Sequence, residues 1–381
     1  MNRRTDPWLI TLTVLLVIIG LVMVYSASAV VAGETTGEQT TYVIRQTLGI
    51  ASGLVLCVAT AVTPMRVLRR YRKVLYAMAV IGLILCLVPG IQHRANGASR
   101  WIGVGSIHLQ PSEFAKIIVL ITLAHFLHRN RAFLADPRVL IRAGLIPLPI
   151  MALILMEPDF GTTAILGGLC SIMLVVAGAR YRHMLVVAVG AVVVGVPLML
   201  LEQYRVQRLT AFLRPWETMD KEGYHIIQSW IAMHSGGMWG QGLGNSIAKL
   251  HWLPEPWTDF IGAVIAEELG LVRLLCLIGL YSLLIWRGMH IAQRARDSFG
   301  MFLAATLTAM IGFEAFFNLA VVMGMVPPKG LVLPFISYGA SAMQSHLWMI
   351  GILLSVAAEA EDVPVEQGWL RPSKPKSQAA K

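Results

Sequence analysis

Long apolar runs separated by short polar segments fill most of the chain. Each run is about as long as the roughly 20 residues that a helix needs to cross a bilayer. The pattern predicts ten membrane-spanning helices, and one long polar loop at about 202–257 between the seventh and the eighth. The predicted spans are about 8–31, 43–63, 74–90, 112–128, 140–156, 161–178, 184–201, 258–286, 299–325 and 335–357.

The composition agrees with a membrane protein. Of the 381 residues, 56% are hydrophobic and only 14% are charged, whereas a soluble domain carries about 25% charged residues. The mean hydropathy is +0.67. We therefore expect an all-α polytopic integral membrane protein with one domain over residues 1–357 and a disordered polar tail over 358–381.

Positive charge is concentrated in alternate connections between the runs. Arg66–Lys73 follows the second run, Arg129–Arg142 the fourth and Arg287–Arg296 the eighth. Connections rich in Lys and Arg stay in the cytoplasm, so both termini are predicted to be cytoplasmic and the loop at 202–257 extracytoplasmic. The formal net charge of +10 is then a topology signal, and no nucleic-acid partner is expected.

Four polar motifs fall on the predicted outer side of the membrane. They are QPSEFAK at 110–116, EPDFGT at 157–162, LPEPWTDFI at 253–261 and PPKGLVLPFISYG at 327–339. A charged side chain at the bilayer centre costs about 3 kcal/mol or more and usually has a function. Scattered structural residues would have no reason to gather on one face, so the motifs predict a site at the outer interface.

Together and in this order, the four motifs resemble the SEDS family (shape, elongation, division and sporulation), over nearly the whole chain. The segments 244–249 and 328–330 look more like the division branch, FtsW, than the elongation branch, RodA. Trp257 stands where the family usually has His, and Glu314 where glutamine is common. The family's SYGGSS is similar to the segment 337–342, which reads SYGASA.

The resemblance implies a peptidoglycan glycosyltransferase of the cytoplasmic (inner) membrane. Such an enzyme polymerises lipid II into β-1,4-linked glycan strands at the outer face, with inversion and with polyprenyl pyrophosphate leaving, during septal cell-wall synthesis. It works beside a class B penicillin-binding protein, a transpeptidase, and other divisome membrane proteins. The runner-up in the same family is an elongation polymerase of the RodA type.

Asp259 is the predicted general base. Glycosyl transfer needs a group that takes the proton of the attacking hydroxyl, and Asp259 is expected where the outer loop enters the eighth span. There a carboxylate can be ionised yet partly desolvated, which raises its basicity. The alternative is that Asp259 caps the helix together with Thr258.

Seven further residues are predicted to bind substrate. Arg100 and Lys329 are candidate ligands of the pyrophosphate, with snorkelling interfacial charges as the alternative. Glu113 and Lys116 lie three residues apart on one predicted helix face, where the alternative is a local ion pair. Lys249, Glu255 and Ser337, which lie in or beside the outer motifs, complete the set.

Other acids within the apolar runs leave two interpretations open. Glu267 and Glu268 are expected deeper in the eighth span than Asp259, in a buried polar network that includes Glu314 and Asn318 of the ninth. Such acids could instead line a translocation path, so a lipid II flippase is the main rival function, and a non-catalytic scaffold is another. The acids of the turn at 157–159 could stabilise the turn or belong to the site.

No cofactor is certain from the sequence. A divalent cation, Mg²⁺ or Mn²⁺, is a hypothesis based on the pyrophosphate leaving group. The glycine-rich segment 240–246 lacks the spacing of a nucleotide-binding loop, and we expect a flexible loop that approaches the lipid head group.

Overall fold

The computed structural model describes residues 6–89, 92–95, 98–104, 107–220 and 223–361, and most of them are helical. The helices are α1 (Pro7–Thr36), α2 (Thr41–Val62), α3 (Met65–Leu87), α4 (Pro111–Arg129), α5 (Pro137–Leu145), α6 (Leu148–Met156), α7 (Phe160–Val176), α8 (Tyr181–Leu200), α9 (Gln203–Leu213), α10 (Tyr224–Gly236), α11 (Ile261–Gln293), α12 (Ser298–Val322) and α13 (Ala340–Glu361).

Several helices begin at residues that suit a helix start. Pro is found in the first turn of α1, α4 and α5, where its missing N–H costs nothing. The side chains of Asp6, Asp159 and Asp297 accept hydrogen bonds from the first turns of α1, α7 and α12, which satisfies N–H groups that have no partner inside the helix. These caps fix where the apolar runs begin.

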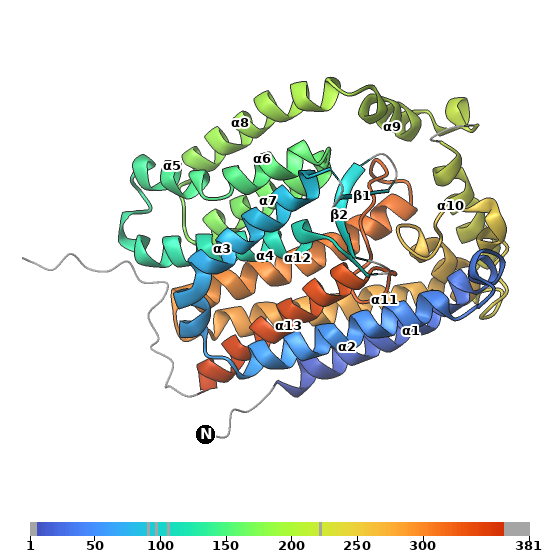
Figure 1. Cartoon of the computed structure of the whole chain (residues 1–381), viewed down its shortest axis with the longest axis horizontal. Coiled ribbons are helices and arrows are strands. Elements are labelled where there is room, and N and C mark those ends of the chain that lie inside the picture. The colour runs from blue at the N-terminus through green and yellow to red at the C-terminus, as the bar shows by residue number, and fades with distance from the viewer. Residues whose placement is uncertain (1–5, 90–91, 96–97, 105–106, 221–222, 362–381) are drawn as a thin grey trace, which may run out of the picture.

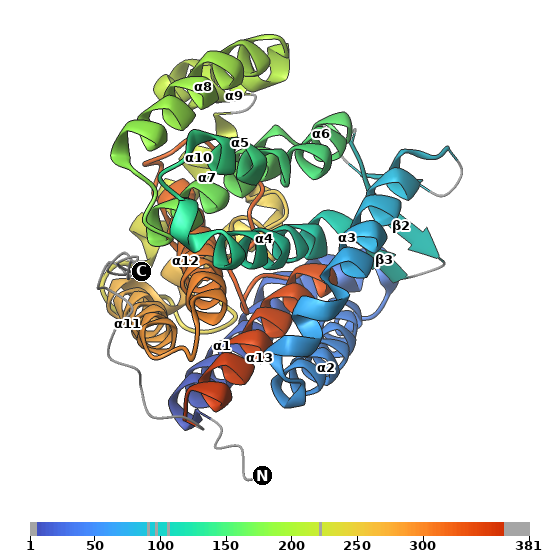
Figure 2. The ribbon, with the colours of Figure 1, turned by 90° about the vertical axis from the view of Figure 1, so that its left-hand side faces the viewer.

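The helices form one bundle with α4 and α12 at its centre (Figures 1 and 2). Helices α1, α2 and α13 lie on one side of this centre, and α8 and α9 lie on the opposite side, at the edge of the molecule. Helix α12 is largely buried, whereas α8 has no buried residue. The start of α1 and the end of α13 lie at the same end of the bundle (Figure 1), as the predicted topology requires.

Each of the ten predicted spans falls on helical residues, which confirms an almost entirely helical polytopic fold. Within the described chain, seven helical stretches are long and apolar enough to cross a membrane: 7–35, 41–62, 137–156 (α5 and α6 together), 181–200, 261–293, 298–322 and 340–360. Helices α3, α4 and α7 account for the other three predicted spans. The number ten stays a prediction.

Several predicted boundaries are wrong, and α11, for example, ends at Gln293 and not at 286. Helix α3 begins at Met65, about nine residues early, because the basic residues of its first turns hide the apolar pattern. Helix α13 begins at Ala340 and not at 335, since the segment before it is irregular, and it extends to Glu361, into the predicted tail. The rest of that tail lies outside the described residues.

Two predicted connections have structure that the sequence analysis missed. The connection before α4 forms a small antiparallel sheet of β1 (Gln92–Ala95), β2 (Ala98–Val104) and β3 (Ile107–Leu109), in the order β1-β2-β3. The long outer loop contains α9 and α10, the short helix η2 (Pro215–Thr218) and one π-helical turn, η3 (Ala248–Trp252). It is therefore largely helical and not a simple loop.

Helix α11 is broken at Gly270, where the backbone is extended with φ 79° and ψ 173°. The segment 237–242 supplies the hydrogen bonds lost at the break. Its amides at Gln241 and Gly242 donate to the carbonyls of Glu267 and Glu268, and its carbonyls accept from the amides of 271 and 272. Irregular backbone within a membrane needs such partners. A Cβ on Gly270 would lie 2.4 Å from the Gly240 nitrogen, so this contact requires glycine.

The connection between α12 and α13, residues 323–339, folds back into the bundle, and we call it the re-entrant loop. The hydroxyl of Tyr281 donates to the Pro334 carbonyl at 2.5 Å. Tyr281 lies in α11, eleven residues after the break at Gly270. The contact with the loop is therefore about 16 Å along the helix from that break. Phe335 and Ile336 pack against Gly20, in the middle of α1. This loop carries the fourth outer motif into the protein.

Candidate active site

A cavity of about 350 Å³ lies where the third and fourth outer motifs meet. Its walls come from α9, the start of α10, the segment before α11 and the re-entrant loop. The lining residues are Arg208, His225, Pro254, Glu255, Asp259, Phe260, Pro328, Lys329 and Gly330. Of the predicted site residues, the structure thus brings Asp259, Glu255 and Lys329 together around one cavity.

The backbone around Asp259 is fixed by hydrogen bonds. The Asn318 amide group donates to the carbonyls of Asp259, at 2.8 Å, and Leu331, at 2.5 Å. The Ser337 hydroxyl donates to the Thr258 carbonyl at 2.7 Å, and the Tyr338 amide donates to Trp257. Ser337 therefore holds the segment that carries Asp259, and its predicted contact with substrate stays a prediction.

Gly330 lets the Asp259 carboxylate lie against the backbone of the re-entrant loop. A Cβ on Gly330 would lie 2.8 Å from Oδ2 of Asp259, which is closer than real Cβ contacts allow. Among the described residues, that carboxylate makes no direct ion pair. Its oxygens are therefore free to accept a proton from a molecule in the cavity.

The surroundings of Asp259 make it a stronger base than an ordinary carboxylate. Burial, and then the negative charge of Glu255, raise the pKa of Asp259 to about 6, although Arg208, Lys329 and Arg100 oppose the shift. A base is most effective when its pKa lies near the working pH. Asp259 meets that condition and is still mostly ionised at pH 7.

Lys329 is a buried cation that lines the same cavity. Its Nζ is buried and has no hydrogen-bond partner in the described part of the chain, and its side chain lies against Gly161 of the second motif. Burial lowers the pKa of Lys329 to about 8, and the charge of Asp159 only partly offsets this. At neutral pH it is a desolvated ammonium with unused donors, which suits a phosphate ligand.

The sequence analysis missed two cavity residues, Arg208 of α9 and His225 of α10. The exposed Arg208 adds a second cation, and the His225 ring stacks on Phe260 at 5.8 Å. No spacing connects either residue to Asp259 in sequence. The one available signal was that basic residues gather in a segment predicted to be extracytoplasmic, where they are not needed for topology. Glu255, at φ 46°, adopts a backbone conformation that is uncommon outside glycine.

Arg100 of β2 lies beside the second motif. It donates to the Pro158 carbonyl at 3.0 Å, and its Nε is 3.7 Å from the carboxylate of Asp159. Asp159 caps α7 through Thr162, so it stabilises the turn and also contributes charge near Lys329. Burial, and then the charge of Asp159, raise the pKa of Glu157 to about 8. Arg100 is thus anchored at the edge of the site, outside the cavity lining.

Glu113 and Lys116 lie apart from the cavity, in a buried group of four charged or titratable residues between α4, α12 and α13. Lys116 Nζ is 3.1 Å from Glu113 and 2.8 Å from Glu314, whose other oxygen is 2.8 Å from His346. We call these four residues the buried quartet. The local ion pair considered for Glu113 and Lys116 is present, and a substrate role for either stays a prediction.

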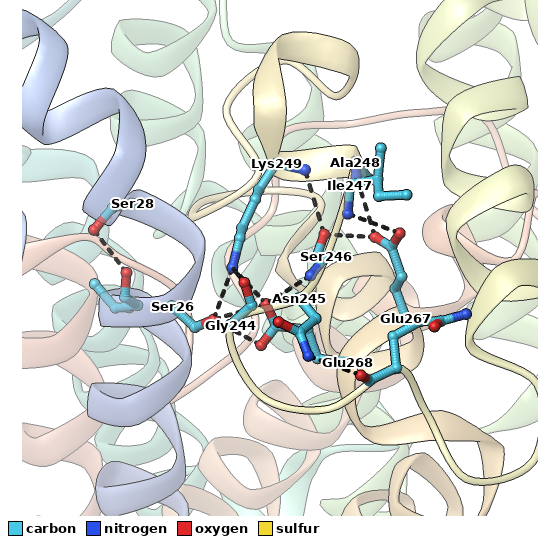
Figure 3. A network of polar contacts seen from close by, with 12 residues as sticks. Ser26, Ser28, Gly244, Asn245, Ser246, Ile247, Ala248, Lys249, Glu267 and Glu268 are labelled. Carbon is cyan, nitrogen blue, oxygen red and sulfur yellow. Dashed lines mark hydrogen bonds and ion pairs between the residues drawn. The ribbon is translucent and has the colours of Figure 1, made fainter.

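Lys249 forms an ion pair with Glu268. The sequence instead predicts Glu314 and Asn318 as the partners of Glu267 and Glu268. The Nζ of Lys249 is 2.8 Å from the Glu268 carboxylate and 2.6 Å from the Gly244 carbonyl (Figure 3). The predicted network of Glu267 and Glu268 exists, but its predicted partners are wrong. Both glutamates bind the outer segment 244–249, because the break at Gly270 brings that segment against α11.

The described residues do not form a metal site of their own. Among them there is no group of three or more His, Cys, Asp or Glu side chains that could hold a metal ion, and the two carboxylates that line the cavity are accompanied there by two cations, Lys329 and Arg208. Mg²⁺ or Mn²⁺ stays a hypothesis in which the substrate itself would have to supply ligands.

Comparison with known sequences assigns the family. Residues 7–362 match the family of cell cycle proteins that comprises FtsW, RodA and SpoVE. The chain belongs to this family. The SEDS resemblance seen in the motifs is therefore confirmed over almost the whole chain.

Relatives in the FtsW/RodA/SpoVE family match at full length. Stage V sporulation protein E of Bacillus subtilis is 37% identical, over 93% of this chain and 98% of its own length. The probable peptidoglycan glycosyltransferases FtsW of Coxiella burnetii and Halothiobacillus neapolitanus are 38% and 40% identical over 94% of this chain, and over 97% and 87% of their own lengths.

Solved structures show the same fold. One match is a chain of a peptidoglycan synthase complex that coordinates polymerization and crosslinking, with a TM-score of 0.76 and 27% identity over 93% of this chain and 98% of that one. Another is the rod shape determining protein RodA of Thermus thermophilus, with a TM-score of 0.67 and 26% identity over 93% and 96%.

Proposed function

We propose that this chain is a peptidoglycan glycosyltransferase that polymerises lipid II at the outer face of the cytoplasmic membrane during septal cell-wall synthesis. The observation that carries the proposal is one cavity lined by both a desolvated carboxylate, Asp259, and a buried ammonium, Lys329, neither of which has a direct ion pair within the described chain. The names of the FtsW relatives support the reaction class. The septal location rests on the same names.

The reaction uses the two sides of the cavity differently. Asp259 accepts the proton of the acceptor sugar's 4-hydroxyl as that oxygen attacks the anomeric carbon of the donor. The bond from that carbon to the pyrophosphate breaks, which inverts the anomeric centre and gives a β-1,4 linkage. Lys329 and Arg208 stabilise the negative charge on the leaving polyprenyl pyrophosphate. Arg100 adds positive charge at the edge of the site.

A class B penicillin-binding protein is the partner we propose. The strand made in the cavity must be crosslinked, and a chain with this fold belongs to a synthase complex that couples polymerization and crosslinking. Other divisome membrane proteins and the membrane lipid complete the expected partners.

The contacts of the intramembrane acids do not favour the flippase. Glu314 is paired with Lys116 and His346, and Glu268 with Lys249. Glu267 accepts hydrogen bonds from the backbone of residues 247 and 248. Acids with these partners stabilise the packing of helices, and none of these three carboxylates is free to line a path.

The test is Asp259→Asn in purified protein with lipid II and the partner transpeptidase. We expect polymer to fall by about 10²–10⁴-fold, the usual contribution of a general base, with no loss of thermal stability. Glu217→Gln, which removes an exposed carboxylate that does not line the cavity, is the matched control and should keep full activity. Full polymerisation by Asp259→Asn would contradict the role of the base, and lipid II crossing vesicles without polymer would favour the flippase.

A further inference from the structure

Besides the buried quartet, the proposed reaction leaves a second buried polar cluster unused. It comprises Ser246 and Lys249 of the outer segment, Glu267 and Glu268 next to the helix break, and Ser26 of α1 (Figure 3). We call these five residues the clamp. All but Ser26 are at most 5% exposed, so the clamp is not a surface for a soluble ligand.

Glu267 binds the turn that opens η3. Its carboxylate accepts from the Ser246 hydroxyl at 2.5 Å, from the Ile247 amide at 3.0 Å and from the Ala248 amide at 3.3 Å. These are amides at the start of a helical turn, which otherwise lack partners. One carboxylate thus satisfies several donors of the outer segment.

Glu268 ties the same segment to α1. It accepts from Lys249 Nζ at 2.8 Å and from the Ser26 hydroxyl at 2.7 and 2.6 Å. Lys249 also donates to the Gly244 carbonyl. A buried carboxylate and a buried ammonium that share these bonds compensate each other's charge, and either one alone would be strongly unfavourable.

The clamp connects the two ends of the chain segment that carries Asp259. Residues 246–249 lie at one end and 267–268 at the other, and the residues between them, 250–266, include the cavity residues Glu255 and Asp259. We call residues 250–266 the site segment. Joining its ends removes much of its conformational freedom, because a closed loop has fewer states than an open one.

We propose that the clamp is a positioning device. It joins the two ends of the site segment and thereby holds Asp259 at the cavity. The role in catalysis rests on the proposed function. In this proposal, Lys249, Glu267 and Glu268 together position the site segment. Lys249 is then a positioning residue and not the substrate contact predicted from the sequence. The residues of the clamp act through Asp259 and do not touch the reacting atoms.

The competing explanation is that the cluster only packs α11 against α1. The chain contains a matched pair for this comparison at the other end of the same two helices, where Arg287 of α11 bonds Asp6 at 2.8 Å. That pair also joins α1 to α11, but no site segment lies between its partners. Removing it tests packing without touching the clamp.

The experiment compares two charge-neutral double variants, Lys249→Gln with Glu268→Gln and Asp6→Asn with Arg287→Gln. Each removes one cation and one anion, so neither leaves a buried charge unpaired. For the clamp variant we expect amide hydrogen exchange in residues 250–260 to rise at least about tenfold. We also expect kcat to fall about tenfold, because misplacing a catalytic group by about 1 Å can cost up to 10²-fold. KM should stay within about twofold, since substrate binding is not removed.

The Asp6 and Arg287 variant should leave exchange in residues 250–260 and kcat unchanged. Unchanged exchange in the clamp variant, an equal rise in both variants, or faster exchange with normal kcat would each overturn the proposal. Hydrogen exchange is measured without enzymatic activity. It therefore shows whether the clamp orders residues 250–260 even if the proposed function is wrong. If the wild-type chain makes no glycan, the positioning role falls with the proposed function.

Discussion

The buried quartet and the cavity contain similar residues in opposite situations. In the quartet, Lys116 lies between two carboxylates, and Glu314 is further bonded to His346. In the cavity, Asp259 has no direct ion pair within the described chain, and Lys329 Nζ has no hydrogen-bond partner there. Both regions keep charge out of water, which is unfavourable unless the charge is compensated.

The difference indicates what each region is for. Charges that satisfy one another hold α4, α12 and α13 in one arrangement, and they have no capacity left for a substrate. Charges left without partners cost stability, which is typical of a functional site and agrees with the proposed roles in pyrophosphate binding and proton transfer. Replacing a quartet residue should therefore damage folding first, and replacing a cavity residue should damage chemistry first.

The largest effect on stability is expected for Lys116→Ala. It leaves the carboxylates of Glu113 and Glu314 buried without their cation, and breaking a buried pair in this way costs about 3–5 kcal/mol. The free energy of unfolding, measured by titrating the purified protein with a denaturing detergent, checks this. Lys116→Gln combined with Glu314→Gln removes one charge of each sign and should lose less. A stable but inactive Lys116→Ala would place Lys116 with the catalytic charges.

Lys329→Met should show the opposite behaviour. Removing one group that stabilises the charge of a transition state typically lowers kcat by about 10²–10³-fold. Stability should be unchanged or higher, since an unpaired buried ammonium is lost. Steady-state polymerisation of lipid II and a thermal unfolding curve measure the two effects. A strongly destabilised variant with normal kcat per folded molecule would assign Lys329 to structure.

The sequence was sufficient for the helical membrane fold and for three residues of the cavity. Apolar runs of membrane-spanning length identify helices because a bilayer imposes their length, and charged residues at one interface stand out against that background. For this reason Asp259, Glu255 and Lys329 were predicted from local motifs, and the structure places all three on one cavity.

Contacts between distant segments could not be predicted in the same way. The break in α11 depends on Gly270 meeting Gly240, and a single glycine in an apolar run does not indicate a break. Without the break, Glu267 and Glu268 were assigned partners in α12. Arg208 and His225 reach the cavity from helices within the long outer loop, for which no periodicity connects them to Asp259.

The pH dependence of kcat/KM for lipid II polymerisation tests the central claim most directly. Asp259 must be ionised, so kcat/KM should rise about tenfold per pH unit up to about pH 6. Lys329 must be protonated, so kcat/KM should fall above about pH 8. The alkaline fall should disappear in Lys329→Met, while the acidic rise stays. A profile that is flat through pH 6, or an alkaline fall that survives in Lys329→Met, would contradict the assignment of the two cavity charges.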